Sequence, residues 1–243
     1  MHIKAFLPAS LIEYPGHIAD VVYVGACNFR CPYCYNVDLV LCPEQLPDIE
    51  LARVLQRLEA RRGFVDGLAI TGGEPTVQSG LIAFLADVRQ LGLSVKLDTN
   101  GYRPDVLQEC LERRWVDYVA MDVKTSLARY EPVAGVAVDP KRLQQSIELL
   151  LRSEIDYEFR TTVVPGLVSL QDVRAIVDLI AGARRYYLQC FRPGETLGWG
   201  RDAPVGPPSP ELVQEMAGLA ASQVQEVGIR GLPQGGNAHA YRS

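Results

Sequence analysis

Residues 27–36 read Cys27-Asn28-Phe29-Arg30-Cys31-Pro32-Tyr33-Cys34-Tyr35-Asn36, and they follow the apolar segment 19–26. The three cysteines are separated by three residues and then by two. Three thiolates are one fewer than the four that fill a [4Fe–4S] cluster, so one iron of such a cluster would stay open to a substrate. The run therefore predicts an iron–sulfur site after a strand, with Cys27, Cys31 and Cys34 as its ligands.

A structural zinc site is the alternative interpretation of the same cysteines, with Cys42 as the fourth thiolate. Zinc sites more often have two separated cysteine pairs about 12–20 residues apart, and no second pair follows here. Cys42, Cys110 and Cys190 are scattered along the chain, and isolated cysteines usually behave as small core hydrophobes.

The composition is that of an ordinary globular protein. The 243 residues are 48% apolar and 22% charged, which is enough for one α/β domain with a buried core. No apolar run approaches the roughly 18 residues of a membrane span, and the N-terminus lacks a signal-peptide pattern. Six cysteines in a chain of this length do not form a secreted disulfide framework, so we expect a cytoplasmic protein. A net charge of −5 without a basic block argues against nucleic acid as a partner.

Short apolar strands alternate with amphipathic helices, and this pattern predicts parallel βα units. Strands at 1–8 and 19–26 flank a turn at 14–16, and form an N-terminal β-hairpin. We expect further strands at 67–71, 93–98, 116–122, 157–163 and 185–191, and helices at 50–61, 80–91, 104–113, 141–151 and 170–181. Counted from 19–26 there are six parallel strands, in a barrel or an open sheet.

The pattern changes after residue 193. Residues 193–210 are rich in Gly and Pro and read as a loop. Ser209 followed by Pro210 is a good helix start, and the helix is expected to run to about Gln225. A last strand is expected at 227–231. The tail 234–243 has no strong pattern, and we expect it to be mobile.

Polar residues follow the predicted strands one after another, where an α/β barrel gathers its chemistry. The cysteine run follows the first strand. The later candidates are Gly72, Gly73 and Glu74 after the second strand, Asp98, Thr99 and Asn100 after the third, Asp122 and Lys124 after the fourth, Arg160 near the end of the fifth, and Arg192 after the sixth. Six polar strand ends are hard to explain as turns alone.

Two of these motifs also have a plain structural interpretation. Paired glycines let a backbone approach a ligand, and Glu74 could then accept hydrogen bonds from an ammonium group. The same residues could form only a turn that ends in a helix-start carboxylate. Asn100-Gly101 is likewise a common turn dipeptide.

The charged candidates allow two interpretations as well. Asp122 and Lys124 are two residues apart, so on an extended chain both face one side. They could bracket a zwitterionic ligand, or form an exposed ion pair worth about 0–1 kcal/mol. Arg160 within a strand needs a partner. That partner is either a ligand carboxylate, gripped by two parallel hydrogen bonds, or a structural contact with Glu158 or Asp122.

The run CNFRCPYCYN resembles the radical S-adenosylmethionine (radical SAM) superfamily, and in particular the activases of anaerobic ribonucleoside-triphosphate reductase. The run LQCFRP at 188–193 is similar to the same branch. Over residues 1–193 the resemblance implies a partial (β/α)6 barrel of the TIM type. The whole chain 1–243 would then be a single domain, with a core of about 19–193 and a helix/strand extension at 194–243.

The resemblance also implies the cofactors, a [4Fe–4S] cluster and S-adenosylmethionine (SAM) bound on its open iron. It places Gly72, Gly73 and Glu74 at the amino group of SAM, and the Asp98–Asn100 segment near its methionine part. It also places Asp122, Lys124 and Arg160 as cofactor clamps, Tyr33 against the adenine, Arg192 at the ribose or the partner, and Asn36 among the cofactor contacts. Carboxylates nearby would bind a monovalent cation. Tyr35 stands where related chains often have His.

The implied activity is that of an oxidoreductase, because SAM is cleaved reductively and the resulting radical removes a hydrogen atom from a glycine of a partner. The expected partner is the glycyl-radical subunit of anaerobic ribonucleotide reductase, with flavodoxin or ferredoxin as electron donor. The sequence does not indicate a hydrolase triad, since His2, His17 and His239 lie outside every motif. Two alternatives stay open: a radical enzyme for a small molecule or peptide, in cofactor or modified-base synthesis, and a non-catalytic zinc-stabilised binding module.

Overall fold

The computed structural model describes residues 1–232 and 241–242, and it has the alternation of strands and helices that the sequence predicts. Contacts between residues divide the chain into two units. The first unit consists of Met1–Asn28, Asn36–Ala120 and Glu154–Asp156. The second consists of Phe29–Tyr35, Met121–Ser153 and the described residues from Tyr157 onward.

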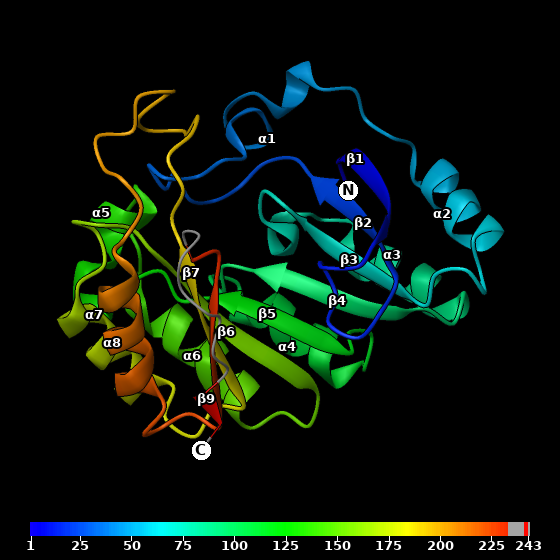
Figure 1. Ribbon diagram of the computed structural model, residues 1–243. Helices are drawn as coiled ribbons and strands as arrows, with labels where there is room; N and C mark the ends of the chain where they lie inside the picture. The colour runs from blue at the N-terminus through cyan, green and yellow to red at the C-terminus, as the bar shows by residue number, and fades with distance from the viewer. Residues whose placement is uncertain (233–240, 243) are drawn as a thin grey trace. The chain divides into compact units, whose positions relative to one another are not determined.

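The first unit begins with the expected hairpin. Strand β1 (Ile3–Ser10) pairs antiparallel with β2 (Ala19–Val24), which in turn pairs in parallel with β3 (Gly67–Gly72) (Figure 1). Strand β3 continues in parallel to β4 (Ser94–Thr99), and the sheet order of this unit is β1-β2-β3-β4-β5. Its other elements are α1 (Val37–Leu41), η1 (Pro43–Gln45), α2 (Leu51–Ala60), η2 (Pro75–Val77), α3 (Leu81–Gln90), α4 (Pro104–Glu112) and the greater part of β5 (Tyr118–Asp122).

The second unit contains a parallel run of its own. Strands β6 (Asp156–Val163), β7 (Arg185–Cys190) and β8 (Glu226–Arg230) pair in parallel, and the short β9 (Tyr241–Arg242) adds antiparallel to β8. Its helices are η3 (Leu127–Arg129), α5 (Tyr130–Ala134), α6 (Pro140–Leu151), α7 (Leu170–Leu179) and α8 (Pro210–Ala220). Helix α8 packs against α7, β7 and β8 (Figure 1).

The helix starts are set by local chemistry. Ser169 and Asp172 form a reciprocal capping box at the start of α7, and Ser209 accepts a hydrogen bond from Leu212 N at the start of α8. Pro210 occupies the first position of α8, as expected, because its missing N–H would have no partner there. These polar caps fix the ends of the helices, and their apolar faces then determine the packing.

Two features differ from the expectation. Helices α1 and α5 were not expected, because five residues are too few to show helical periodicity. Helix α8 ends at Ala220 rather than near Gln225, since Gln223 O and Gln225 N bond to the backbone of Gly182 and Ala183 instead. The predicted tail at 234–243 lies outside the described residues, apart from the part that forms β9.

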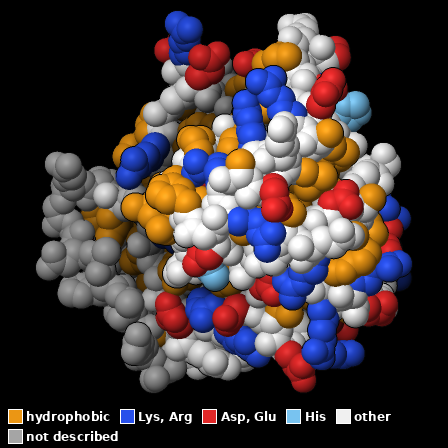
Figure 2. Space-filling model, turned by 90° about the vertical axis from the view of Figure 1, so that its right-hand side faces the viewer, with side chains coloured by type: hydrophobic (Ala, Val, Ile, Leu, Met, Phe, Trp, Pro, Cys, Tyr) orange, Lys and Arg blue, Asp and Glu red, His pale blue; other side chains and the backbone are white. Residues whose placement is uncertain are grey.

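The face of the molecule seen in Figure 2 is mixed in character. Lys and Arg side chains are interspersed with Asp and Glu, and apolar side chains lie between them. The turn after β1 exposes two large apolar side chains, Leu11 and Ile12. No helix among residues 1–232 and 241–242 has both the length and the apolar character that crossing a membrane requires.

Candidate functional site

The cysteine run lies between β2 and α1, and none of its three cysteines forms a disulfide. Cys27 belongs to the first unit, whereas Cys31 and Cys34 belong to the second. The N–H of Cys34 donates to the carbonyl of Cys31 at 3.1 Å, so these two residues close one turn. Burial raises the pKa of the Cys31 thiol, and the positive charge of Lys124 opposes that shift. A lysine beside a thiol favours the thiolate, which is the form that binds metal.

The glycine pair after β3 packs directly on the backbone that leads into Cys27. Gly73 N donates to Val24 O at 2.8 Å, and Glu74 N donates to Ala26 O at 2.9 Å. A Cβ at Gly73 would lie 1.9 Å from the carbonyl oxygen of Ala26, and Gly72 has a φ of +113°. Only glycine allows this approach. The predicted motif therefore has a structural task, which is to hold the first residues of the cysteine run.

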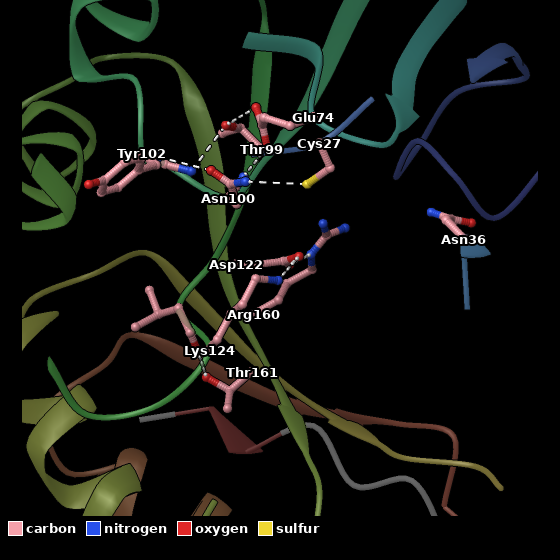
Figure 3. A network of polar contacts seen from close by, with 12 residues as sticks. Cys27, Asn36, Glu74, Thr99, Asn100, Tyr102, Asp122, Lys124, Arg160 and Thr161 are labelled. Atoms are coloured by element: carbon pink, nitrogen blue, oxygen red, sulfur yellow. Dashed lines mark hydrogen bonds and ion pairs between the residues drawn. The ribbon is translucent and has the colours of Figure 1, made fainter. Parts of the chain in front are cut away.

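The Glu74 carboxylate is buried and accepts four hydrogen bonds from its own unit (Figure 3). Oε1 accepts from Thr76 N at 3.0 Å, Thr76 Oγ1 at 2.5 Å and Thr99 Oγ1 at 2.8 Å, and Oε2 accepts from Asn100 N at 2.7 Å. Burial raises the pKa of this carboxyl, and the four donors oppose the shift. Glu74 is also the N-cap of η2, so the alternative interpretation as a helix-start carboxylate is correct. This role still leaves Oε2 able to accept a further hydrogen bond.

Asn100 connects the end of β4 to the cysteine run. Its Nδ2 donates to Asn28 Oδ1 at 2.8 Å and lies 3.9 Å from Cys27 Sγ, and its Oδ1 accepts from Tyr102 N at 3.0 Å (Figure 3). Among the described residues the buried Nδ2 of Asn28 has no hydrogen-bond partner. A buried donor without an acceptor is costly, so this amide fits a bound group that supplies one, such as a cluster sulfide or a ligand carboxylate.

The two ends of the run are held by amides, only one of which the sequence indicated. Asn36 Nδ2 donates to Gly72 O at 2.6 Å. Gln78 Nε2 donates to Gly25 O at 2.6 Å, two residues before Cys27. Gln78 was missed because its partner is 53 residues away and no motif contains it. Asp98, the remaining candidate of this unit, accepts a hydrogen bond from the Lys96 ammonium.

In the second unit Asp122 lies between two cations (Figure 3). Its Oδ2 is 3.4 Å from Lys124 Nζ, and its Oδ1 accepts from Arg160 Nε at 2.9 Å. Arg160 thus has the structural partner named as an alternative, and Glu158 Oε1 is 4.0 Å from its Nη1. The Lys124 and Arg160 side chains are only 13% and 12% exposed, so this is not the exposed ion pair of the alternative interpretation. Lys124 and Arg160 carry two positive charges beside the single negative charge of Asp122. The excess positive charge suits a ligand that has a carboxylate of its own.

The aromatic candidates have different surroundings. Tyr33 is buried in the second unit, and burial raises its pKa well above the usual range. Tyr35 is half-exposed, and its hydroxyl bridges the backbone of Arg192: it donates to Arg192 O at 2.6 Å and accepts from Arg192 N at 3.0 Å. Its ring stacks on Phe191, 6.0 Å between centroids. Tyr35 therefore links the cysteine run to the residues that follow β7.

The loop after β7 contributes contacts that the sequence did not indicate. Leu197 N donates to Cys34 O and Gly198 N to Pro32 O, both at 2.9 Å. A Cβ at Gly198 would lie 2.6 Å from Pro32 Cβ, and Trp199 packs edge-on against Phe191. These residues hold the second half of the cysteine run, which the Gly and Pro content of the loop alone could not predict.

The other cysteines behave as core residues or lie apart. Cys110 is buried in α4, and burial raises its pKa to about 12. Cys190 is buried at the end of β7. Cys42 follows α1, and its thiol points to Asp38 Oδ1 at 4.0 Å. No three His, Cys, Asp or Glu side chains in residues 1–232 and 241–242 are grouped so as to hold a metal ion.

Known proteins resemble the chain over most of its length. A protein of Methanocaldococcus jannaschii, provisionally named a glycyl-radical enzyme activating enzyme, is 28% identical over 233 residues, which are 94% of this chain and 95% of that protein. The 7-carboxy-7-deazaguanine synthase of Thermoplasma acidophilum is 28% identical over 185 residues, which are 70% of this chain and 82% of the synthase.

A solved structure shares the fold. Streptococcus suis SuiB, crystallised with S-adenosylmethionine, superposes with a TM-score of 0.63 at 14% identity, over 87% of this chain and 50% of that one. The likeness confirms the predicted α/β fold of the partial-barrel type. The sequence pattern of the radical SAM superfamily matches residues 21–180, from β2 through α7. Because the match spans well over half of the sequence, the chain belongs to the radical SAM superfamily.

Proposed function

We propose that this radical SAM protein is an activating enzyme that generates a glycyl radical on a partner enzyme. One observation carries the proposal: the match to the M. jannaschii protein provisionally named as such an activase extends over 94% of this chain. The contacts within each unit support the underlying chemistry. In the first unit Gly73 and Asn100 hold the start of the cysteine run, and in the second unit residues 197–198 hold its end.

Membership in the superfamily implies a [4Fe–4S] cluster and SAM. The cluster would be held by Cys27, Cys31 and Cys34. SAM would be held by the side chains and backbone of the predicted set, Tyr33, Asn36, Gly72, Gly73, Glu74, Asp98, Thr99, Asn100, Asp122, Lys124, Arg160 and Arg192. When bound, the cluster and SAM would supply one-electron reductive cleavage of the S–C5′ bond and, through it, the removal of a hydrogen atom from the substrate.

The chain's own residues bind and orient. Oε2 of Glu74 can accept a hydrogen bond from an ammonium group, because the bond from Asn100 N occupies only one of its lone pairs. Lys124 and Arg160 provide positive charge for a carboxylate, and that charge is already ordered by Asp122. Within each unit these groups are preorganised, so neither the carboxylate acceptor nor the cationic pair would have to reorganise when its ligand group binds.

The proposed substrate is a glycine α-carbon on a flexible segment of the partner. We propose the catalytic subunit of anaerobic ribonucleotide reductase, because the runs CNFRCPYCYN and LQCFRP resemble activases of that branch. A flavodoxin or ferredoxin would deliver the electron in the cytoplasm.

Electron paramagnetic resonance tests this proposal under strict anaerobiosis. The reconstituted protein is mixed with SAM, a reductant and the candidate reductase, and a glycine-centred doublet on the reductase is the expected signal. The signal should be absent with a reductase whose radical glycine is replaced by alanine, and absent with Cys31→Ala activase. A reduced-cluster signal that changes on SAM addition, without any doublet, would contradict this partner.

A small-molecule radical reaction is the second candidate, favoured by the equal identity to the deazaguanine synthase over 70% of the chain. Incubation with SAM and dithionite separates the two. An activase leaves candidate small molecules unchanged and needs the protein partner. A deazaguanine product formed from a small molecule in the absence of any partner would favour the second candidate.

A further inference from the structure

A lysine lies beside Asp98 on β4, the strand whose end carries three of the predicted cofactor contacts. Lys96 and Asp98 both lie on β4, and the Nζ of Lys96 donates to Asp98 Oδ1. Their side chains are only 3% and 10% exposed. Residues two apart on a strand face the same side, so the pair occupies one face of β4.

The surroundings of Lys96 are apolar at its own level of the sheet. The register places Val21 beside Ala69 and Ala69 beside Lys96, and both neighbours are buried. An ammonium in such surroundings is costly unless a counter-charge is close. An apolar side chain would often give equal or greater stability at such a position. The presence of lysine there therefore calls for a role toward Asp98.

The family resemblance implies a monovalent cation held by carboxylates close to the cofactor. At Asp98, one of the carboxylates expected at the cofactor, the residues present do not fit such a cation. Asp98 Oδ1 already accepts from an ammonium. The neighbouring Thr99 hydroxyl donates to Glu74 Oε1 at 2.8 Å and accepts from Gly101 N at 3.1 Å. A metal cation at Asp98 would meet the fixed positive charge of Lys96 within a few ångströms, which is strongly unfavourable away from bulk water.

We infer that the Lys96 ammonium takes the place of that cation: it neutralises Asp98 and fixes the orientation in which this carboxylate meets the cofactor. The inference rests on the proposed SAM site. Lys96 is a positioning residue, because it acts through Asp98. The protein should accordingly bind SAM without any requirement for potassium or sodium.

The test measures the Kd of SAM for the reconstituted holoprotein by anaerobic equilibrium dialysis, in KCl, NaCl or tetramethylammonium chloride of equal ionic strength. The wild-type Kd should agree within about twofold across the three salts. Lys96→Met should weaken binding about 10–100-fold in tetramethylammonium, as expected for the loss of one hydrogen bond to a charged group. KCl or NaCl should restore part of that affinity, because a small ion can then reach Asp98.

A second lysine provides a matched control. Lys4 is equally buried, with 5% of its side chain exposed, and it contacts Asp48 Oδ1 at 2.7 Å and Leu46 O at 2.9 Å. Lys4→Met should leave the SAM Kd and its indifference to salt unchanged. Thallium-205 resonance broadening gives an independent measure, expected for Lys96→Met and not for the wild type.

A potassium or sodium requirement in the wild type would overturn the inference. So would wild-type affinity of Lys96→Met in tetramethylammonium. If Lys96→Met does not fold, the neutral pair Lys96→Met/Asp98→Asn replaces it, and is expected to bind SAM weakly and without response to cations. A response of that double variant to potassium would again contradict the inference. Absence of wild-type SAM binding in all three salts would overturn the cofactor assignment itself, whereas SAM binding without a glycyl radical would count only against the activase proposal.

Discussion

At the scale of single residues, Gly73 is the position where packing leaves least freedom. Gly73→Ala would place a methyl group 1.9 Å from Ala26 O, which is backbone and cannot rotate away. We expect the folded state to lose about 1–3 kcal/mol through overpacking, and the cysteine run to shift. The iron and sulfide content after reconstitution should fall. The free energy of unfolding of the apoprotein, measured with denaturant, should fall as well.

Gly218 is the control for Gly73, because it lies in α8 and a Cβ there meets nothing within 4 Å. Gly218→Ala should stabilise the protein by about 0.5–1 kcal/mol, since alanine is the better helix former. Iron loading of Gly73→Ala at the wild-type level would show that the glycine pair does not hold the cluster ligands.

Cys31→Ala tests the ligand set itself. Removing one of three thiolates should abolish the cluster with an open iron, so both the brown absorbance and SAM cleavage should disappear. Cys42→Ala should keep both, because the Cys42 thiol lies beside Asp38 after α1. Retained SAM cleavage in Cys31→Ala would refute the assignment of the ligands. Bleaching by Cys42→Ala would instead favour a four-ligand arrangement in which Cys42 takes part.

At the scale of elements, the loop at 194–200 is expected to determine how well the second half of the cysteine run is ordered. Gly198→Ala would bring a Cβ within 2.6 Å of Pro32 Cβ and weaken the hydrogen bond from Gly198 N to Pro32 O. We expect cluster loss in air to become several-fold faster, with little change in the thermal midpoint of the apoprotein. Gly206→Ala is the control, since nothing lies within 4 Å of its Cβ position. Equal cluster lifetimes of the two variants would show that the loop does not determine how well the cysteine run is ordered.

The start of α7 provides a prediction about pH. Burial raises the pKa of Asp172, but hydrogen bonds from Ser126 and Ser169 and the charge of Arg129 outweigh it, so the net pKa is lowered. A lowered pKa contributes stability that is present above the unfolded value of about 3.9 and is lost as the pH falls through the folded value. Asp172→Asn should therefore cost about 1–3 kcal/mol at pH 7, as for other lost charged hydrogen bonds.

Urea unfolding of wild type and Asp172→Asn at several pH values measures this difference. The gap in unfolding free energy should begin to narrow below a pH of about 4 and close as the pH falls through the lowered pKa of the folded state, where the wild-type carboxyl is protonated as well. A gap that is independent of pH would mean that the contacts of the capping box, and not the charge, stabilise α7.

The same elements show which parts of the fold could be predicted. Strands β2 to β7 and helices α2 to α4, α6 and α7 were located within a few residues, because apolar periodicity and caps are local signals. Helices α1 and α5 have no such signal. The end of α8 depends on hydrogen bonds to residues 182–183, some 40 positions away, and could not be predicted from local pattern.

At the scale of the whole molecule, the residue types of the candidate site could be predicted but their contacts could not. Spacing and strand ends indicated Glu74, Asn100, Asp122 and Arg160. The sequence did not show that Arg160 bonds to Asp122 across 38 residues. Gln78, Lys96 and Gly198 were missed for the same reason, since each acts through a partner or a close approach that only folding creates.

The last prediction concerns the stability of the whole protein on binding SAM. A ligand at about 100 times its Kd stabilises the folded state by about 2.7 kcal/mol, which for a chain of this size raises the thermal midpoint by about 5–10 °C. Glu74→Gln should reduce this shift to less than about half, because an amide cannot accept from both its protein donors and an ammonium as a carboxylate does. Anaerobic calorimetry of the reconstituted protein measures the shift, and Glu215→Gln on the exposed face of α8 is the control. An undiminished shift in Glu74→Gln would remove Glu74 from the SAM site. Because Asn100 and Thr99 are held by that same carboxylate, the proposed contacts at the end of β4 would then need a different arrangement.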